Sequence, residues 1–130
     1  ELSELPEPNS DGRSIVLVID DDRGAIDLIR DFLGESAYQV VGLTLPAIAL
    51  KAAQKLKPHV IITDVLMPTL DGWDVIQTLQ NDPITASIPV IVHSVIDRRA
   101  QGAQAGAAAV LVKPVSRQAL ISAVGAALRR

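Results

Sequence analysis

Five short apolar runs, most of them rich in β-branched residues, recur along this chain, and each is followed by a segment with helical spacing. The runs cover Ser14 to Ile19, Tyr38 to Leu43, Val60 to Ile62, Ile88 to Val92 and Val110 to Val112. Apolar runs of this length are typical of strands buried on both faces, as in parallel sheets. The alternation therefore predicts an α/β fold with a parallel sheet, right-handed crossovers and helices on both faces.

The intervening segments carry helix-end signals as well as helical spacing. Gly34 is suited to end the first helix, Pro46 to begin the second and Ser116 to cap the last. Gly102 weakens the fourth helix, which is short. The predicted helices are Ala25 to Leu33, Ile48 to Leu56, one from Trp73 to a stop at Asn81-Asp82-Pro83, Asp97 to Ala105, and a final one with Leu120, Ile121, Val124 and Leu128 on one stripe.

The chain length and composition fit one domain, predicted over residues 14–130. With 130 residues, of which 48% are apolar, the chain can bury a single sizeable core. Residues 1–13 are polar, contain Pro6 and Pro8, and carry four acids. This composition favours a linker or a flexible N-terminal tail.

The third apolar run leads into the stretch Ile61-Ile62-Thr63-Asp64-Val65-Leu66-Met67-Pro68-Thr69-Leu70-Asp71-Gly72. Asp64 stands where the run stops, and Pro68 with the Asp71-Gly72 pair predicts a turn. The carboxyl end of a strand is where open α/β sheets place their ligands. A single aspartate there is more often a turn or capping residue, so the other strand ends decide its meaning.

Polar residues follow the ends of three other strands. Asp20 and Asp21 follow the first, Ser94 follows the fourth and Lys113 follows the fifth. Because parallel strands end at one edge, we expect these side chains to lie together with Asp64. Each alone could be a capping, loop or surface residue, but their coincidence at successive strand ends is not what that interpretation predicts.

Three carboxylates brought together would repel one another unless a cation intervened. A hard divalent ion with oxygen ligands, Mg²⁺ above all and Mn²⁺ as an alternative, resolves this with few protein ligands. Lys113 adds a positive charge and Ser94 adds a hydrogen-bond donor. Together these groups suit the holding of a phosphoryl group on or near a carboxylate.

Composition excludes several other classes. The chain has no cysteine, which excludes disulfides and thiolate metal sites and favours a reducing compartment, so we expect the cytoplasm. Its apolar runs are too short to span a membrane. Aromatic residues make up 2%, the net charge is −3 and no helix carries a basic stripe, so we expect no direct nucleic-acid binding.

The ordered motifs resemble those of the response-regulator receiver domain of two-component signalling. They are Val-Leu-Val-Ile-Asp20-Asp21, Asp64-Val-Leu-Met-Pro with Asp71-Gly72, Ser94, and Leu-Val-Lys113-Pro114. The resemblance covers about Ile15 to Arg129. It implies a flavodoxin-like (βα)5 fold with strand order 2-1-3-4-5 and a domain that controls a partner or an attached domain by changing conformation.

The resemblance also implies a role for each matching residue. Asp64 would accept a phosphoryl group from a phosphohistidine on a sensor histidine kinase or a phosphotransfer protein. Asp20, Asp21, Asp64 and the backbone carbonyl of Leu66 would form the Mg²⁺ site, with Asp20 acting through a bound water. Lys113 would pair with the phosphoryl oxygens and Ser94 would hydrogen-bond one of them. The domain would thus catalyse its own phosphorylation and a slow dephosphorylation without being a conventional enzyme.

Further residues match switch or structural positions of the family. The resemblance implies a cis peptide bond at Pro114, and Met67, Pro68 and Gly72 match the turn after the phosphoacceptor strand. Val110 stands where many receivers carry a tyrosine or phenylalanine that rotates with the hydroxyl switch. A valine cannot report by swinging a ring, so we expect no aromatic coupling here.

Two further departures lead to expectations. The segment from Ser94 to Gly106 is shorter than usual, and its opening is similar to receivers attached to hybrid histidine kinases. We therefore expect a weakened dimer face on the fourth and fifth helices. Leu66 and Ile96 flank the expected phosphoryl site with apolar side chains, which predicts a long-lived phosphoryl group because no polar side chain guides hydrolytic water.

Other function classes remain open at this stage. A pseudo-receiver would bind partners without phosphotransfer, although Asp64, Asp21 and Lys113 are all in place. A metal-dependent phosphatase with an aspartyl nucleophile would need a second carboxylate where this chain has Leu66. A flavin-binding protein of the same fold would need a hydroxyl-rich phosphate loop, whereas three aspartates follow the first strand.

Overall fold

The computed structural model describes residues 5–6, 12–68 and 70–129, and its strands and helices alternate along the chain. In order the elements are β1 (Ser14–Ile19), α1 (Arg23–Leu33), β2 (Tyr38–Leu43), the 3-10 helix η2 (Pro46–Ile48), α2 (Ala49–Leu56), β3 (Val60–Thr63), β4 (Leu66–Met67), β5 (Leu70–Asp71), α3 (Gly72–Asn81), β6 (Val90–Ser94), α4 (Arg99–Ala105), β7 (Ala109–Val112) and α5 (Arg117–Leu128). The predicted α/β architecture is confirmed.

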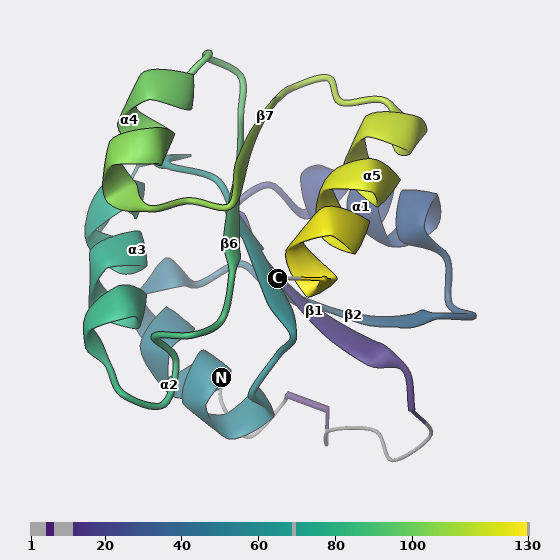
Figure 1. Ribbon diagram of the computed structural model, residues 1–130, viewed down its shortest axis with the longest axis horizontal. Coiled ribbons are helices and arrows are strands. Elements are labelled where there is room, and N and C mark those ends of the chain that lie inside the picture. Colours follow the sequence, from purple (N-terminus) through teal and green to yellow (C-terminus); the bar gives the residue numbers. More distant parts are fainter. Residues whose placement is uncertain (1–4, 7–11, 69, 130) are drawn as a thin grey trace.

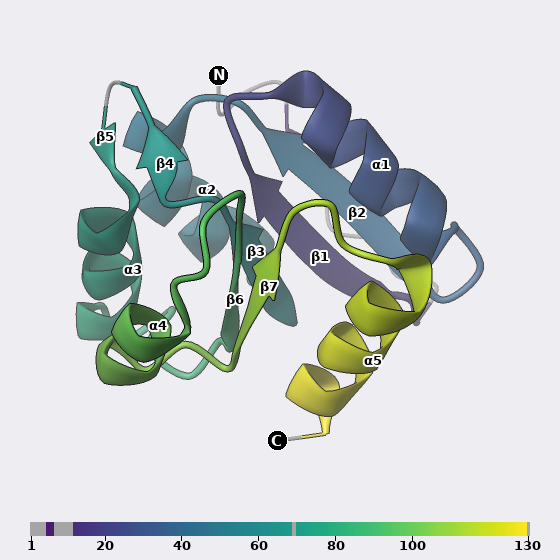
Figure 2. The same cartoon turned by 90° about the horizontal axis from the view of Figure 1, so that it is seen from above.

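The central sheet has the order β2-β1-β3-β6-β7, and every neighbouring pair is parallel. Since β4 and β5 form a separate hairpin, this is the 2-1-3-4-5 order that the resemblance implied. Figures 1 and 2 show α1 and α5 covering one face of the sheet and α2, α3 and α4 covering the other. All five strands therefore end at one edge.

The two faces of the sheet form two hydrophobic clusters. Leu17 and Ile19 of β1 point into the cluster under α2 and α3, while Val16 and Val18 point into the one under α1 and α5. All four are at most 1% exposed. Each such side chain contributes about 1.5–3 kcal/mol through burial, which is why strands apolar on both sides settle at the centre of the sheet.

The fourth strand of the central sheet differs from its predicted bounds. It runs over Val90–Ser94 and not over residues 88–92. Pro89 precedes it, and the strand continues through His93 and Ser94 because these pair in register with Leu111 and Val112 of β7. Pairing with a neighbouring strand, which the local sequence does not encode, thus sets the end of β6.

Two helix predictions also need correction. The helix expected from Asp97 begins at Arg99, because an Asp97 carboxylate oxygen accepts the Arg99 N–H in a turn that precedes the helix. Ile121 was placed on the buried stripe of α5 but is 43% exposed. The buried positions of α5 are Leu120, Val124 and Ala127.

The other helix signals act as predicted. Ser116 caps α5 by accepting the Ala119 N–H. Pro46 begins the short 3-10 turn that leads into α2, and Gly34 ends α1 with a positive φ of 71°.

The turn predicted after Asp64 is a small antiparallel hairpin, β4–β5, followed at once by α3. Gly72 makes this return possible: a Cβ at that position would lie 2.3 Å from the Val65 Cα and 2.8 Å from the Asp64 carbonyl oxygen. Any side chain there would force the backbone beside Asp64 to move. Met67 packs into the core, as expected of a residue that packs in the turn.

Most of the predicted linker over residues 1–13 lies outside the described residues, as does Arg130. Within that segment, Leu5 packs against the cluster that lies under α2. Among the described residues no helix has both the length and the apolar character that crossing a bilayer would require.

Candidate phosphoacceptor and metal site

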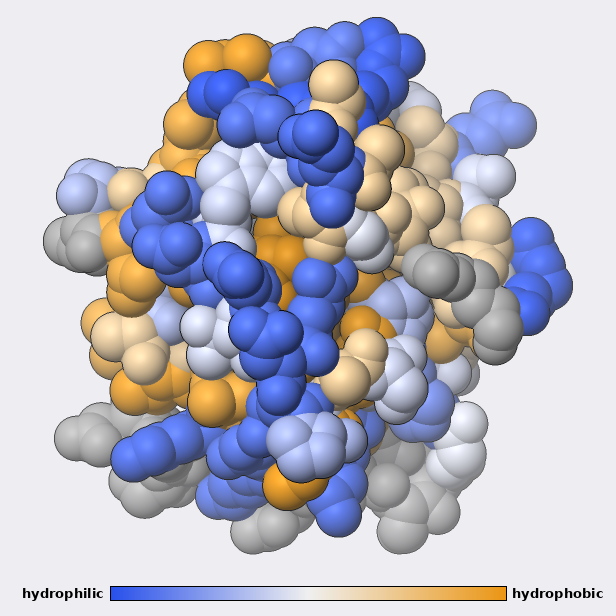
Figure 3. Space-filling view, turned by 60° about the vertical axis from the view of Figure 1, so that its left-hand side comes forward, coloured by the Kyte–Doolittle hydropathy of each residue, from blue (hydrophilic) through white to orange (hydrophobic). Residues whose placement is uncertain are grey.

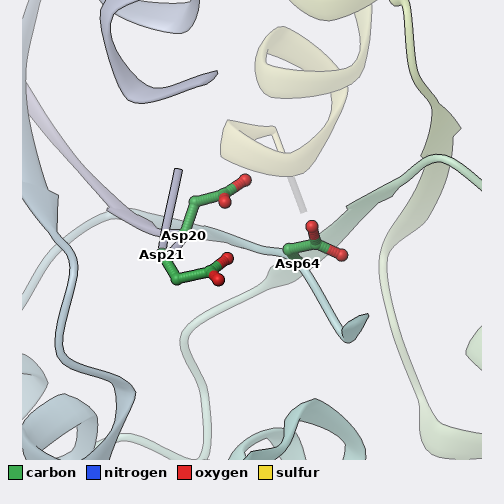
Figure 4. Close-up of side chains that lie close together, drawn as sticks. All are labelled: Asp20, Asp21 and Asp64. Atoms are coloured by element: carbon green, nitrogen blue, oxygen red, sulfur yellow. The ribbon is translucent and has the colours of Figure 1, made fainter. Parts of the chain in front are cut away.

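The three aspartates predicted to converge lie together at the carboxyl edge of the sheet. Asp20 and Asp21 follow β1 and Asp64 follows β3, and one carboxylate oxygen from each lies within 4.8 Å of the others. Figure 4 shows the Asp20 and Asp21 side chains extending toward Asp64. Asp20 and Asp64 are buried, whereas Asp21 is exposed. The cluster is thus open to solvent from one side.

Main-chain hydrogen bonds place the first and third strand ends side by side. The Asp64 N–H donates to the Ile19 carbonyl at 3.1 Å, and the Asp20 N–H donates to the Leu43 carbonyl at 3.0 Å. The carboxylates are then fixed by the residues that follow them. Asp20 Oδ1 accepts the Asp22 N–H and Asp64 Oδ1 accepts the Leu66 N–H, each at 2.9 Å.

The second oxygens of the same two carboxylates meet Lys113. Its ammonium lies 2.9 Å from Asp20 Oδ2 and 3.0 Å from Asp64 Oδ2. The Lys113 N–H also donates to the Ser94 carbonyl at 2.7 Å, which fixes the lysine at the end of β7. The Lys113–Pro114 peptide bond is cis, as the resemblance implied.

Burial and pairing act against each other at this site. Burial raises the pKa of Asp20, although the Asp22 N–H and Lys113 stabilise its charged form. Burial also opposes the charge of Lys113, but its hydrogen bonds to Asp20 and Asp64 outweigh this and raise the pKa of the lysine. The lysine therefore stays an ammonium at neutral pH.

The donor set fits a hard divalent cation. One ammonium cannot balance three carboxylates, so the ionised cluster keeps an excess of negative charge. The carboxylate oxygens lie close enough together to share one ion, and oxygen ligands are what Mg²⁺ prefers.

Ser94 is the last residue of β6 and is fully buried at the same edge. Its hydroxyl oxygen lies 3.5 Å from the Ile96 N–H, a long hydrogen bond that ties it to the loop before α4. Ile96 and Leu66 are 48% and 39% exposed, so both predicted apolar neighbours are at the surface.

Asp22 separates from the other two acids of its run. Its side chain caps α1 by accepting the Gly24 N–H at 2.9 Å. Among the three aspartates that follow β1, the helix-capping role therefore belongs to Asp22.

The two histidines lie in different surroundings. His59 is exposed, and its Nδ1 accepts the Ile15 N–H at 2.9 Å, which links the turn before β3 to β1. His93, beside Ser94, is buried with neither ring nitrogen hydrogen-bonded to any described residue. Burial, reinforced by the charge of Lys113, lowers the pKa of His93 to about 4. The sequence signal for the burial of His93 is its position within an apolar run that forms a strand.

Val110 is half-buried on β7 and faces Gly102 of α4. A Cβ on Gly102 would lie 2.3 Å from Val110 Cγ2. Gly102 therefore does more than weaken α4, because its missing side chain lets the helix approach the strand.

Comparison with known proteins decides the family. Residues 16–125 match the family described as the response regulator receiver domain. The chain belongs to this family. The receiver domain is 35% identical over 103 residues to the response regulator PleD of Caulobacter vibrioides, which covers 77% of this chain and 23% of PleD. It is 36% identical over 118 residues to the transcriptional regulatory protein PrrA of Mycobacterium tuberculosis, covering 88% and 50% of the two chains.

Solved structures agree with this family. The receiver domain of the Francisella response regulator 1452 superposes with a TM-score of 0.81 at 29% identity, covering 91% of this chain and 98% of that one. The chain spans at most about half the length of the two curated relatives named above. It corresponds to their receiver portion, and the phosphoacceptor role in two-component signalling fits this family.

Proposed function

We propose that Asp64 is the phosphoacceptor of a two-component phosphorelay and that phosphorylation changes the conformation of the β6–α4 loop. The observation that carries the proposal is the position of Lys113, whose ammonium is shared by Asp64 and Asp20 at 3.0 and 2.9 Å. A cation held beside one member of an acidic cluster suits the neutralisation of phosphoryl oxygens on that member.

Asp20, Asp21, Asp64 and the backbone carbonyl of Leu66 are the groups that would hold Mg²⁺, or Mn²⁺ in its place. When bound, the ion would neutralise part of the carboxylate charge and of the charge on the incoming phosphoryl oxygens. Three carboxylate oxygens within 4.8 Å of one another support this assignment.

In the proposed step, a carboxylate oxygen of Asp64 attacks the phosphorus of a phosphohistidine in line. The new O–P bond forms as the P–N bond breaks, and the imidazole leaves with the bonding electron pair. Lys113 offsets the charge of the phosphoryl oxygens, and the Ser94 hydroxyl donates a hydrogen bond to one of them. The product is an aspartyl phosphate that this domain hydrolyses slowly.

The switch follows from added charge. A phosphoryl group on Asp64 brings negative charge and acceptor oxygens next to Ser94. Because the Ser94 hydroxyl is tied to Ile96, its movement toward the phosphoryl group would take the loop before α4 with it. The β6–α4 loop is thus the element whose two positions report phosphorylation.

The partners follow from the same chemistry. The phosphodonor would be a sensor histidine kinase or a histidine phosphotransfer protein, and the output would be a partner or an attached kinase or output domain. Cytoplasmic placement is part of the proposal, since such donors draw their phosphoryl groups from intracellular ATP. Direct nucleic-acid binding by this domain is not part of it.

The test is incubation of the purified chain with acetyl phosphate and Mg²⁺, followed by intact-mass measurement. We expect a mass gain of one phosphoryl group that is lost in Asp64→Asn and retained in Asp74→Asn, an exposed aspartate on α3 that serves as the matched control. A chain that stays unmodified by acetyl phosphate and by phosphorylated histidine kinases would be a pseudo-receiver, and the proposal would be wrong.

A further inference from the structure

A groove of about 730 Å³ opens between the β4–β5 hairpin, the first turn of α3 and the start of α4. Its walls include the apolar side chains of Leu66, Met67, Leu70 and Trp73. Figure 3 brings the α3 and α4 side forward and shows a hollow there, with hydrophobic residues in its floor and hydrophilic residues at its border. Of the residues that line it, Leu66 alone belongs to the proposed phosphoacceptor site.

One cation faces this groove without a carboxylate partner. Arg98 lines it, and in the described part of the chain no carboxylate lies within ion-pair distance of its guanidinium. One nitrogen donates to the Gln101 carboxamide at 2.9 Å, whereas Nε is buried with no hydrogen-bond partner. A buried donor without a partner costs about 1–3 kcal/mol, so an acceptor that reached it would be favoured.

The neighbouring arginine provides the contrast. Arg99 pairs with the Asp97 carboxylate through several hydrogen bonds and is largely exposed. The other charged residue of the groove, Asp71, uses one oxygen to cap α3 through the Trp73 N–H and forms no ion pair with Arg98. Arg98 is therefore the group in the groove that selects for an anion.

A second groove, of about 440 Å³, continues from Trp73 between α3 and α4. Apart from Trp73 and Ala105, the side chains that line it are carboxamides, namely Gln77, Gln80, Asn81, Gln101 and Gln104. A carboxamide both donates and accepts hydrogen bonds, as the peptide group does. A surface of this kind matches the alternating N–H and C=O groups of an extended backbone.

We propose that the two joined grooves bind an extended acidic peptide segment of a partner protein. An apolar side chain of the segment would pack against Trp73 and Leu70, a carboxylate would reach Arg98, and the backbone would lie along the carboxamides of α3 and α4. The chemistry disfavours a nucleic acid, because one cation without a carboxylate partner cannot replace the several phosphate contacts on which such binding depends.

Trp73 makes the test direct, because it is the only tryptophan of the chain and lines both grooves. The probe is acetyl-Gly-Gln-Glu-Leu-Glu-Pro-Gly-amide, and its counterpart carries glutamine in place of both glutamates. In buffer with Mg²⁺, we expect saturable changes in Trp73 fluorescence and a preference of about fivefold for the acidic peptide, the size of one partly exposed ion pair. Isothermal titration calorimetry with the same two peptides detects any binding that does not change the fluorescence.

Variants of the two arginines show which side chain causes the preference for the acidic peptide. Arg98→Gln should bind both peptides equally, Arg98→Lys should keep part of the preference, and Arg99→Gln should keep all of it. The proposal is overturned if neither peptide saturates either signal, if Arg98→Gln retains the preference, or if an eight-nucleotide oligothymidylate binds more tightly than the acidic peptide. Far-ultraviolet circular dichroism confirms that each variant is folded. None of these outcomes depends on phosphorylation of Asp64.

Discussion

At the scale of residues, the two oxygens of each buried carboxylate at the site have different hydrogen-bond partners. In both Asp20 and Asp64, Oδ1 accepts an N–H two residues further along the chain, and Oδ2 is left for Lys113. The local bond fixes the direction of each side chain before any ligand binds. Such preorganisation lowers the cost of gathering like charges in one place.

His93 should make the stability of the domain fall in mild acid. Its pKa is about 4 in the folded chain and 6.5 in a free side chain. Between these values the unfolded chain binds more protons, so stability is present above pH 6.5 and is lost as the pH falls toward 4. We expect about 2 kcal/mol of loss between pH 7 and pH 5 from this residue.

Urea denaturation of the wild type and of His93→Leu at both pH values measures this contribution. The leucine variant should lose about 2 kcal/mol less than the wild type over the same interval, since the other titrating groups are common to both. Equal losses would show that the ring is not the titrating group.

Leu66 should prolong the life of the phosphoryl group. It is 39% exposed beside Asp64 and offers no polar atom on its side chain to orient a water. In Leu66→Asn a carboxamide could guide the attacking water, and we expect hydrolysis to be about tenfold faster. Intact-mass measurement of the phosphorylated fraction after removal of acetyl phosphate gives the half-life.

The matched control for this change is Leu45→Asn, because Leu45 is an exposed leucine just beyond β2. It should leave the half-life unchanged. A wild-type half-life of seconds, or an unchanged half-life in Leu66→Asn, would contradict the expectation.

At the scale of elements, two glycines allow close approaches on which the site depends. Gly72 lets the β4–β5 hairpin return to the backbone of Asp64 and Val65, and Gly102 lets α4 lie against β7. The first contact holds the candidate phosphoacceptor, and the second sets the position of the helix that follows the switch loop. In each case the absence of a side chain on the glycine is what lets the two adjacent elements meet.

Gly102→Ala should destabilise the domain by about 1 kcal/mol, although alanine is the better helix former. The new Cβ would lie 2.3 Å from Val110 Cγ2, and overpacking outweighs the gain in helix propensity. In a Val110→Ala background the clash is gone, so the same change should become stabilising by up to about 1 kcal/mol.

Gly125→Ala in α5 is the control, because a Cβ there would meet only the flexible end of the Arg129 side chain, just after the helix. It should stabilise the domain in both backgrounds. Urea titration measures the free energy of unfolding of each variant. If Gly102→Ala changed this free energy in the same direction in both backgrounds, the proposed contact would be ruled out.

At the scale of the whole molecule, the parallel sheet concentrates charge at one edge. Four strand ends from across the sequence bring three acids, a lysine and a serine to one side of the fold, while the net charge of the chain is only −3. Binding of a cation at that edge therefore acts on the stability of the entire fold.

Mg²⁺ should raise the thermal midpoint of the domain through this cluster. At 100 times its dissociation constant it would add about 2.7 kcal/mol, or about 10 °C for a domain of this size. Asp21→Asn should lose most of this increment, since Asp21 is the exposed acid of the cluster and forms no bond to Lys113.

Asp22→Asn provides the control, because asparagine caps a helix as well as aspartate does and Asp22 lies outside the cluster. Its response to Mg²⁺ should match that of the wild type. Thermal melts followed by circular dichroism give the result, and an equal increment in Asp21→Asn would count against the metal assignment.

The sequence by itself determined the α/β class, the bounds of β1 and β2, the cap at Ser116 and the convergence of Asp20, Asp21 and Asp64. These depend on local patterns: apolar runs read as buried strands, side chains close to the backbone act as caps, and parallel strands must end at one edge. The resemblance added the strand order and the cis bond at Pro114.

Only the tertiary structure decided the rest, because the deciding partners are far away in sequence. β6 extends to Ser94 through pairing with β7, and Ile121 is exposed because the face of α5 toward the sheet lies over Leu120 and Val124. The strand ends predicted that Lys113 lies at this edge, but not that its ammonium pairs with both Asp20 and Asp64, which are 93 and 49 residues away. Local periodicity carries no information about contacts of that range, so the geometry of the site became visible only in the folded chain.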